Sequence, residues 1–155
     1  QTDGLDLELQ YDFAAGGLGD FRTHLLWTHV LEYERDYGDG LGLRSLIGDF
    51  DPENRASLSL GWSRGDFSAN ATVNYMDEAD DGIPDPDFVA ELDSFTTVDL
   101  SFNYSTPWDG RITVGARNVF DEDPPTTENL GNPFYTQYLH DVYGRVPYVR
   151  YEQDL

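Results

Sequence analysis

The richest cluster of potential ligand atoms in this sequence is a run of eight carboxylates between Asp77 and Ser94. Ca²⁺ takes about six to eight oxygen ligands from groups of this kind. The candidate metal ligands are Asp80, Asp81, Asp85 and Asp87. Their spacing differs from that of an EF-hand loop, and a run of like charges is also typical of a solvated surface loop. A Ca²⁺ site and a solvated loop therefore both stay open.

No other set of residues has the spacing of a catalytic site. His24 and His29 lie five apart in one expected strand, so they face opposite sides of it. No nucleophile or acid–base pair stands out around His140 in the last long loop. The chain also lacks a Ser-His-Asp order and a glycine loop that opens a helix. We expect no enzymatic activity, and no cofactor other than the Ca²⁺ ion considered above.

The charge balance excludes one class of partner. The 155 residues include 30 Asp and Glu against 9 basic residues, all Arg, which gives a net charge of −21. Contacts with nucleic-acid phosphates need clustered cations, and we therefore exclude nucleic acid as a partner. The absence of cysteine excludes disulfide scaffolds and zinc sites built on Cys. No apolar run approaches the about 18 residues of a membrane-spanning helix.

Hydrophobicity along the chain has a period of two residues, which indicates β-strands. In the first segment, Leu5, Leu7 and Leu9 alternate with acidic or polar residues. Seven such segments follow one another, at residues 5–13, 21–33, 56–62, 67–75, 98–104, 112–120 and 145–155. Because no segment keeps a helical period, we predict an all-β fold.

The connections between these segments alternate in length. Residues 14–20, 63–66 and 105–110 are short, whereas residues 35–54, 77–94 and 121–144 are long. An antiparallel up-and-down transmembrane β-barrel has this pattern, with tight turns at one end and long loops at the other.

Aromatic residues gather at the strand ends and support the barrel. The short-turn end has Phe13, Phe21, Trp62, Phe67, Tyr104 and Trp108, and the long-loop end has Tyr33, Tyr75, Phe95 and Phe120. Such rows are typical of the aromatic girdles at the two membrane interfaces. The opposite face, rich in Ser, Thr, Asn and Asp, would then line a wet lumen. His29 and Asn118 fall on the apolar side, where a β-bulge or a position near the headgroups would accommodate them.

The turns predict a strand register. A turn at residues 106–110 pairs Tyr104 with Ile112 and sets Asp99 opposite Arg117 on the polar face. We expect a cross-strand ion pair there, which would contribute about 0.2–1 kcal/mol. A turn at Arg64-Gly65 would pair Trp62 with Phe67. The lumen-facing candidates are Asp99, Arg117 and Arg150, either lining a transport path or forming a structural polar lattice.

Two stretches in about the last sixty residues form a familiar pattern: FTTVDLSFNYSTPWDGRITVGARNVFDEDPP, from residue 95, and the terminal YGRVPYVRYEQDL. They resemble the C-terminal barrel strands of TonB-dependent outer-membrane receptors. Its closest markers are residues 118–121, Asn-Val-Phe-Asp, with Pro124-Pro125 after them, and Gly144-Arg145 before the last strand. The segment RASLSLGWSRGDFSANATVNY is similar to an earlier hairpin of the same family.

The resemblance implies that residues 1–155 are about the last seven strands of a barrel of 22 strands, without the plug domain and the N-terminal strands. It implies a receptor in the outer membrane of a Gram-negative bacterium, in contact with lipid and, through the missing N-terminal part, with the TonB complex. Its ligand would be an iron chelate, a vitamin or an oligosaccharide, captured by the long loops. The loop aromatics are the ligand-binding candidates: Tyr37, Phe88, Phe134, Tyr135 and Tyr138.

The alternative is a soluble, acidic β-sandwich that binds carbohydrate, with or without Ca²⁺. The two hypotheses differ in one respect. A sandwich buries the apolar face in its core, whereas a barrel exposes that face to lipid.

Overall fold

The computed structural model describes residues 1–155 except 41, 49–51, 81–90, 127–134, 136–138 and 154–155. Its main sheet is an antiparallel meander of β1 (Thr2–Ala14), β2 (Asp20–Asp36), β4 (Asn54–Arg64), β5 (Phe67–Met76), β8 (Phe95–Ser105), β9 (Gly110–Arg117) and β10 (Val146–Gln153). The short β3 (Leu43–Ser45) pairs with the end of β2, and β6 (Ala79–Asp80) pairs with β7 (Glu91–Leu92). A 3₁₀ turn, η1 (Gly16–Leu18), lies between β1 and β2.

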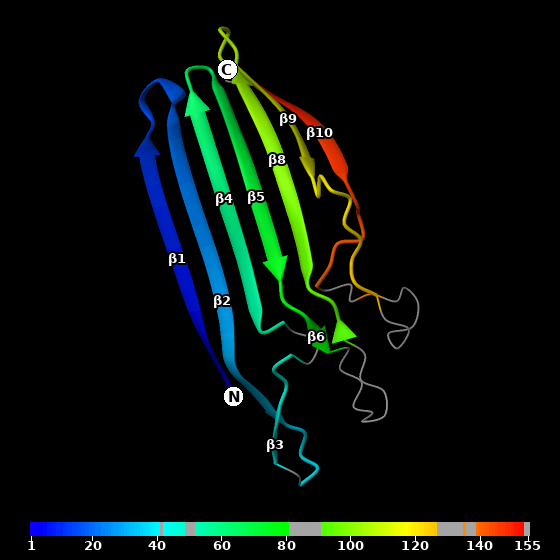
Figure 1. Ribbon diagram of the computed structural model, residues 1–155. Helices are drawn as coiled ribbons and strands as arrows, with labels where there is room; N and C mark the ends of the chain where they lie inside the picture. The colour runs from blue at the N-terminus through cyan, green and yellow to red at the C-terminus, as the bar shows by residue number, and fades with distance from the viewer. Residues whose placement is uncertain (41, 49–51, 81–90, 127–134, 136–138, 154–155) are drawn as a thin grey trace.

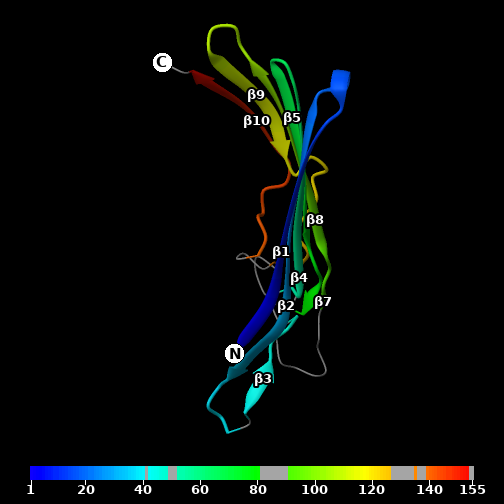
Figure 2. The same ribbon diagram turned by 90° about the vertical axis from the view of Figure 1, so that its left-hand side faces the viewer.

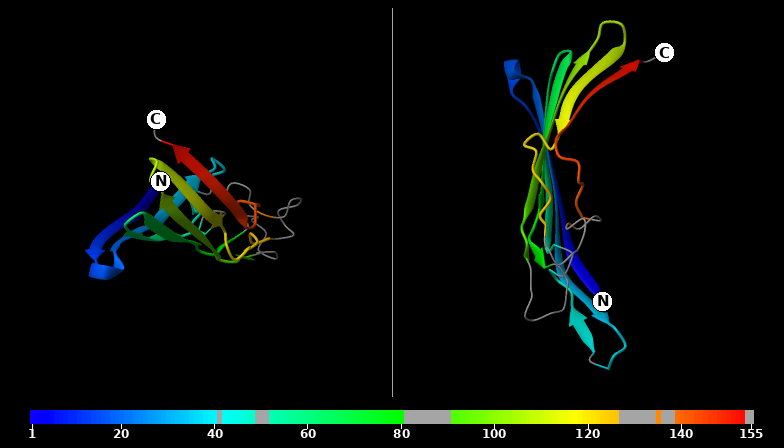
Figure 3. Two further views of the ribbon diagram at one scale, coloured as in Figure 1. Left: turned by 90° about the horizontal axis from the view of Figure 1, so that it is seen from above. Right: turned by 90° about the vertical axis from the view of Figure 1, so that its right-hand side faces the viewer.

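Each long strand pairs with the next along the chain, as an up-and-down barrel wall requires. The sheet is a single twisted layer, seen edge-on in Figure 2 and from above in Figure 3. Among the described strands, β1 and β10 form its two edges and do not pair with each other. In the part of the chain that the structure describes, no helix is long and apolar enough to cross a membrane.

The tight turns lie at one end of the sheet and the long connections at the other (Figure 1). Residues 15–19, 65–66 and 106–109 make the turns, and residues 77–94 and 118–145 belong to the long connections. This arrangement confirms the alternation expected from the sequence.

One face of the sheet is apolar in every strand. A single row across it contains Phe13, Phe21, Trp62, Ala69, Phe102, Val114 and Val149. Its side chains are largely exposed; Leu9, for example, has an exposed fraction of 54%. Among the described residues, the buried apolar side chains are Ala79, Leu92 and Pro52, none of which belongs to this face of the long strands. No second layer covers this face there, so the sandwich alternative is wrong for the described part of the chain.

The aromatic row at the short-turn end is confirmed. The rings of Phe13 and Phe21 stack across β1 and β2, with centroids 5.1 Å apart. Phe67 stacks on Tyr104 at 5.2 Å across β5 and β8. Trp108 donates its indole N–H to the hydroxyl of Tyr151 at 3.1 Å, which extends the row to β10.

The two predicted hairpin registers have different outcomes. Tyr104 pairs with Ile112 as expected. Trp62 pairs with Ala69 instead of Phe67, because the two-residue turn is Gly65-Asp66 and not Arg64-Gly65. Gly65 occupies the first central position with a φ of 57°, the backbone conformation for which a tight hairpin selects glycine. The error of two residues leaves every side chain on its expected face.

The aromatic row at the long-loop end needs three corrections. A β-bulge at Leu31 shifts the register of β2 against β1, so Tyr33 pairs with Thr2 and turns to the polar face. Phe95 pairs with Met76 on the polar face and meets the ring of His140 edge-on at 5.1 Å. Phe120 lies in a turn, because β9 already ends at Arg117.

We predict that neighbouring residues of β8 differ strongly in their tolerance of charge. Leu100 lies near the middle of the apolar face, and Ser101 points to the polar side. Leu100→Arg in the full-length protein should lower the free energy of unfolding in lipid vesicles by about 2–4 kcal/mol. Ser101→Arg is the matched control and should cost much less. Equal losses in urea titrations of the two variants would contradict the assignment of the faces.

Candidate functional site

The polar face is held by a lattice of uncharged side chains in its centre. The lattice joins Ser57 to Asn74 at 3.0 Å, Ser59 to Thr72 at 2.8 Å, Asn103 to Ser68 at 3.2 Å and Thr113 to Asn103 at 2.7 Å. These hydrogen bonds cross from β4 through β5 and β8 to β9. They satisfy the polar groups without placing charge at the centre of this wall.

The β1–β2 flank of the same face is acidic, and its carboxylates have partners. Asp12 accepts a hydrogen bond from the guanidinium of Arg22 at 2.7 Å. His24 lies 2.8 Å from a Glu8 oxygen, and the hydroxyl of Thr28 donates to Asp6 at 2.7 Å. The structural-lattice interpretation therefore describes this flank well.

The opposite flank, on β9 and β10, carries Arg117 and Arg150 on the polar face. The β8–β9 pairing ends at Leu100 and Ala116, one position before Asp99 and Arg117, and the described residues contain no ion pair between these two side chains. Asp99 instead accepts the backbone N–H of Asn118 at 2.8 Å. The prediction was wrong because β9 ends at Arg117 and Asn118 turns its N–H toward Asp99, with a φ of 47°. Asp99 and Arg117 line a hollow of about 160 Å³ together with Asp141 and Tyr143.

Tyr148 of β10 lies against Gly115 of β9 on this flank. A Cβ atom on Gly115 would stand 2.7 Å from the ring and from the Leu100 carbonyl oxygen. Glycine is therefore required by the close approach of the tyrosine, an arrangement known to pin the register of adjacent strands.

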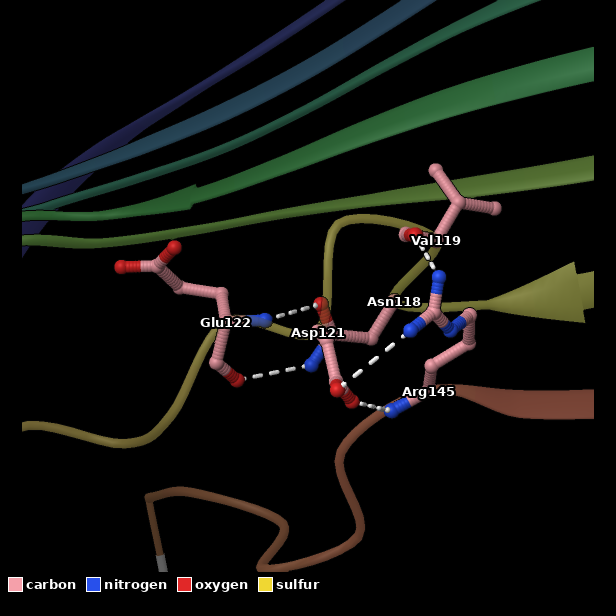
Figure 4. A network of polar contacts seen from close by, with 5 residues as sticks. All are labelled: Asn118, Val119, Asp121, Glu122 and Arg145. Atoms are coloured by element: carbon pink, nitrogen blue, oxygen red, sulfur yellow. Dashed lines mark hydrogen bonds and ion pairs between the residues drawn. The ribbon is translucent and has the colours of Figure 1, made fainter.

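A network of polar contacts closes the base of the connection between β9 and β10 (Figure 4). The side-chain amide of Asn118 donates to the carbonyl of Glu122 at 2.8 Å, and its oxygen accepts the Glu122 N–H at 2.9 Å. Asp121 donates its N–H to the Asn118 carbonyl at 3.0 Å. Residues 118–122 thus form a compact turn, and the side chain of Asn118 holds its backbone through these two hydrogen bonds.

The same turn holds the residues that precede β10. A carboxylate oxygen of Asp121 accepts the backbone N–H of Arg145 at 2.6 Å. The Arg145 guanidinium lies 3.5 Å from the other Asp121 oxygen and 3.4 Å from the carbonyl of Val119 (Figure 4). A Cβ on Gly144 would meet the Asp121 carboxylate at 2.5 Å. We call the residues Asn118, Asp121, Gly144 and Arg145 the base clamp.

A second polar chain lies at the long-loop end of β2, β4 and β5. Asn54 donates its amide to Asp77 at 2.8 Å, and its oxygen lies 3.0 Å from Nδ1 of His29. The hydroxyl of Tyr75 donates to the other Asp77 oxygen at 2.9 Å. His29 is therefore accommodated on the apolar side by a polar partner, next to the bulge expected for it. The Asn54 amide, followed by the Tyr75 hydroxyl, lowers the pKa of Asp77, although partial burial opposes this shift.

The structure describes only some of the expected loop ligands. Tyr37 is exposed, and its ring centroid lies 5.3 Å from the guanidinium of Arg35 and 5.7 Å from that of Arg44. Tyr135 is half-buried. Phe88, Phe134 and Tyr138 lie outside the described residues, and their role stays a prediction.

The expected Ca²⁺ ligands are also mostly outside that range. Asp80 lies in β6 and donates its N–H to the Gly48 carbonyl at 2.6 Å, whereas Asp81, Asp85 and Asp87 are not described. Within the described residues, no group of three or more His, Asp or Glu side chains could hold a metal ion. The Ca²⁺ site stays a prediction.

Comparison with protein families gave a match over residues 1–119 to the model described as TonB dependent receptor-like, beta-barrel. This chain belongs to that family. Comparison with curated proteins and with solved structures gave no match. Membership confirms the resemblance drawn from the sequence, and makes the chain part of an outer-membrane receptor or transporter rather than of an enzyme family.

The base clamp gives the sequence markers of this receptor segment a structural role. Asn118 and Asp121 both adopt positive φ, at 47° and 63°, a conformation that asparagine and aspartate tolerate better than most residues. An Asn and an Asp three residues apart at a strand end could have indicated such a turn. Nothing in the sequence indicates that this turn binds residues 144 and 145.

We predict that the clamp stabilises the receptor. Asn118→Ala removes both side-chain hydrogen bonds and places alanine at positive φ, so the free energy of unfolding should fall by about 2–4 kcal/mol. Asn118→Gly loses the same hydrogen bonds without the backbone strain. Its free energy of unfolding should therefore fall by about 1 kcal/mol less than that of Asn118→Ala. Urea titration of the full-length receptor in vesicles measures both variants. An Asn118→Ala variant as stable as the parent would show that the clamp contributes nothing.

We also predict a pH-dependent contribution from Asp77, which follows the end of β5. Because the folded pKa lies below the usual value near 3.8, this carboxylate stabilises the fold above that value, and the contribution is lost as pH falls through the folded pKa. Asp77→Asn should therefore be less stable than the parent at pH 6, and the difference should shrink at pH 3. A stability difference of equal size at both pH values would show that the ionisation of Asp77 does not contribute to folding.

Proposed function

We propose that this chain forms barrel wall and outer ligand-capture loops of a TonB-dependent receptor that imports a scarce nutrient. The observation that supports this most directly is the two-faced sheet. All seven long strands present apolar side chains on one side and polar side chains on the other, with no described layer over the apolar side. Family membership gives the same function class independently.

The dimensions of the apolar face suit a bilayer. Along β5, the residues from Phe67 to Tyr75 span the face between its two ends. At about 3.3 Å per residue this is about 26 Å along the strand, or about 20 Å in height at the usual tilt of a barrel strand. The outward apolar band of known barrels is about 25 Å tall.

We further infer that the seven strands are the last of a 22-stranded barrel, whose plug and TonB-contacting part lie elsewhere in the protein. Ligand would bind to loops 35–54, 77–94 and 121–144, and energy from the inner-membrane TonB complex would then move the plug. An iron chelate, a vitamin or an oligosaccharide would be the transported ligand. The strand ends that these loops connect lie at the same end of the sheet, which supports a shared ligand site there (Figure 1).

Single-cysteine labelling tests this placement, because the chain has no native cysteine. Cysteines replace Leu58, Ser57, Leu100 and Ser101 one at a time in the full-length receptor, in which any other cysteine is first removed. In outer membranes, a water-soluble maleimide should label positions 57 and 101 and leave positions 58 and 100 at least tenfold less labelled.

The same samples are run on gels with and without boiling. A folded barrel should give a heat-modifiable band heavier than the 17.5 kDa of this chain. Equal labelling on both faces would overturn the proposed function. So would a soluble protein whose migration on the gel is unchanged by boiling.

A further inference from the structure

At the long-loop end of β2, the polar face carries a group of apolar side chains around an opening. A cavity of about 370 Å³ opens there, with an apolar lining of Val30, Tyr33, Leu46, Ile47 and Pro52. Thr2, Thr28, Glu53 and Arg55 complete the lining. Pockets for small molecules have volumes from about 300 Å³ and are mostly apolar. An open, mostly apolar cavity on this largely polar face offers a surface that suits an apolar group.

The cavity depends on the β-bulge at Leu31. Without the extra residue, Tyr33 would share the parity of Trp27 and point to the apolar side of the sheet. With it, Tyr33 pairs with Thr2 and lies in the cavity. Bulges commonly re-aim a side chain beside a functional site. Leu46 donates its N–H to the Tyr33 carbonyl at 2.7 Å, which holds the Leu46 side of the cavity next to β2.

Two arginines stand next to the cavity on the same face. Arg35 follows Tyr33 by two residues and Arg44 precedes Leu46 by two, so each points to the same side as its neighbour, about 7 Å further along the hairpin. Arg35 and Arg44 are directly opposite each other in the β2–β3 register. Both guanidinium groups lie over the ring of Tyr37.

This pairing costs stability in the unliganded protein. Like charges directly opposite each other in a sheet repel. The chain has only 9 basic residues against 30 acidic ones, so two adjacent arginines are unusual in it. Asp39 forms an ion pair with Arg44. Among the described residues, no ion pair joins Arg35 to a carboxylate, and its guanidinium lies 5.3 Å from the centroid of the Tyr37 ring. A pair of guanidinium forks is suited to a carboxylate or phosphate group.

We infer that this end of the polar face binds an amphipathic anion, a small molecule with an apolar or aromatic body and a carboxylate or phosphate group. The body fills the cavity beside Tyr33, and the anionic group meets Arg35 and Arg44. The inference rests on the proposed function and narrows its ligand class. The ligand is a soluble molecule and not a lipid, because the site lies on the face opposite the lipid-facing one.

Two matched probes test the inference with the full-length receptor in phosphatidylcholine nanodiscs. 2-Naphthoate has an aromatic body and a carboxylate, and 2-naphthamide is its neutral counterpart. Calorimetric titration should show naphthoate binding at least tenfold more tightly than naphthamide. Arg35→Gln should weaken naphthoate binding about tenfold or more and leave naphthamide unchanged. Tyr33→Ser should weaken both probes, and Arg64→Gln, in the distant short turn, should weaken neither.

A stability measurement separates binding from a structural role. Arg35→Gln relieves the like-charge repulsion, so the variant without ligand should resist urea as well as the parent does or better. A less stable variant would mark Arg35 as a structural residue and overturn the inference.

Two further outcomes are decisive. If naphthoate binds no more tightly than naphthamide, the inferred anion site is wrong. The proposed function would still stand if the heat-modifiable band and the cysteine-labelling pattern are as expected. Competition between naphthoate and nanodiscs containing lipid A would assign the arginines to a lipid headgroup instead. The inference therefore requires naphthoate binding that lipid A leaves unchanged.

Discussion

Hydrogen bonding of the backbone is the constraint on which the rest of this structure depends. In a bilayer no water is available for an unpaired N–H or C=O, so a strand that crosses must pair along its whole length. The six antiparallel interfaces between β1 and β10 meet this demand, and the register shift at Leu31 falls at the long-loop end of its interface. Continuous pairing fixes the face of every side chain, and with it the chemistry of each side of the wall.

Much of this arrangement follows from the sequence because a period of two is a local property. The alternation of Leu5, Leu7 and Leu9 identifies a strand and its apolar face without any knowledge of the neighbouring strands. Register depends on turns: the prediction is correct for the β8–β9 turn, whereas the Gly65 turn lies one residue later than predicted, which changes the pairing by two residues. A β-bulge near His29 could be considered from the sequence, but its position at Leu31 could not, since one extra residue in β2 has a meaning only against its partner β1. Tyr33 was assigned to the wrong face for that reason.

The site was less predictable than the fold because its contacts join residues distant in sequence. The sequence predicts that Asp99 pairs with Arg117, yet the strand pairing ends one position earlier and the backbone N–H of Asn118 donates to the Asp99 carboxylate. Pairing rules describe positions within strands and fail where a strand ends. Asp121 and Arg145 both belong to the family markers, but their contact joins residues 24 positions apart, which the sequence does not reveal. The cavity beside Tyr33 arises in the same way, from a strand, a bulge and a returning loop.

The base clamp also has an evolutionary consequence. Its hydrogen bonds join Asp121 directly to Arg145, so the entry of the chain into β10 is fixed before the intervening segment contributes anything. Insertions, deletions and substitutions between these two residues can accumulate without shifting the last strand. A lineage can therefore vary the length and sequence of this loop at little risk to the last strand. The four clamp residues should change far more slowly than the segment they enclose.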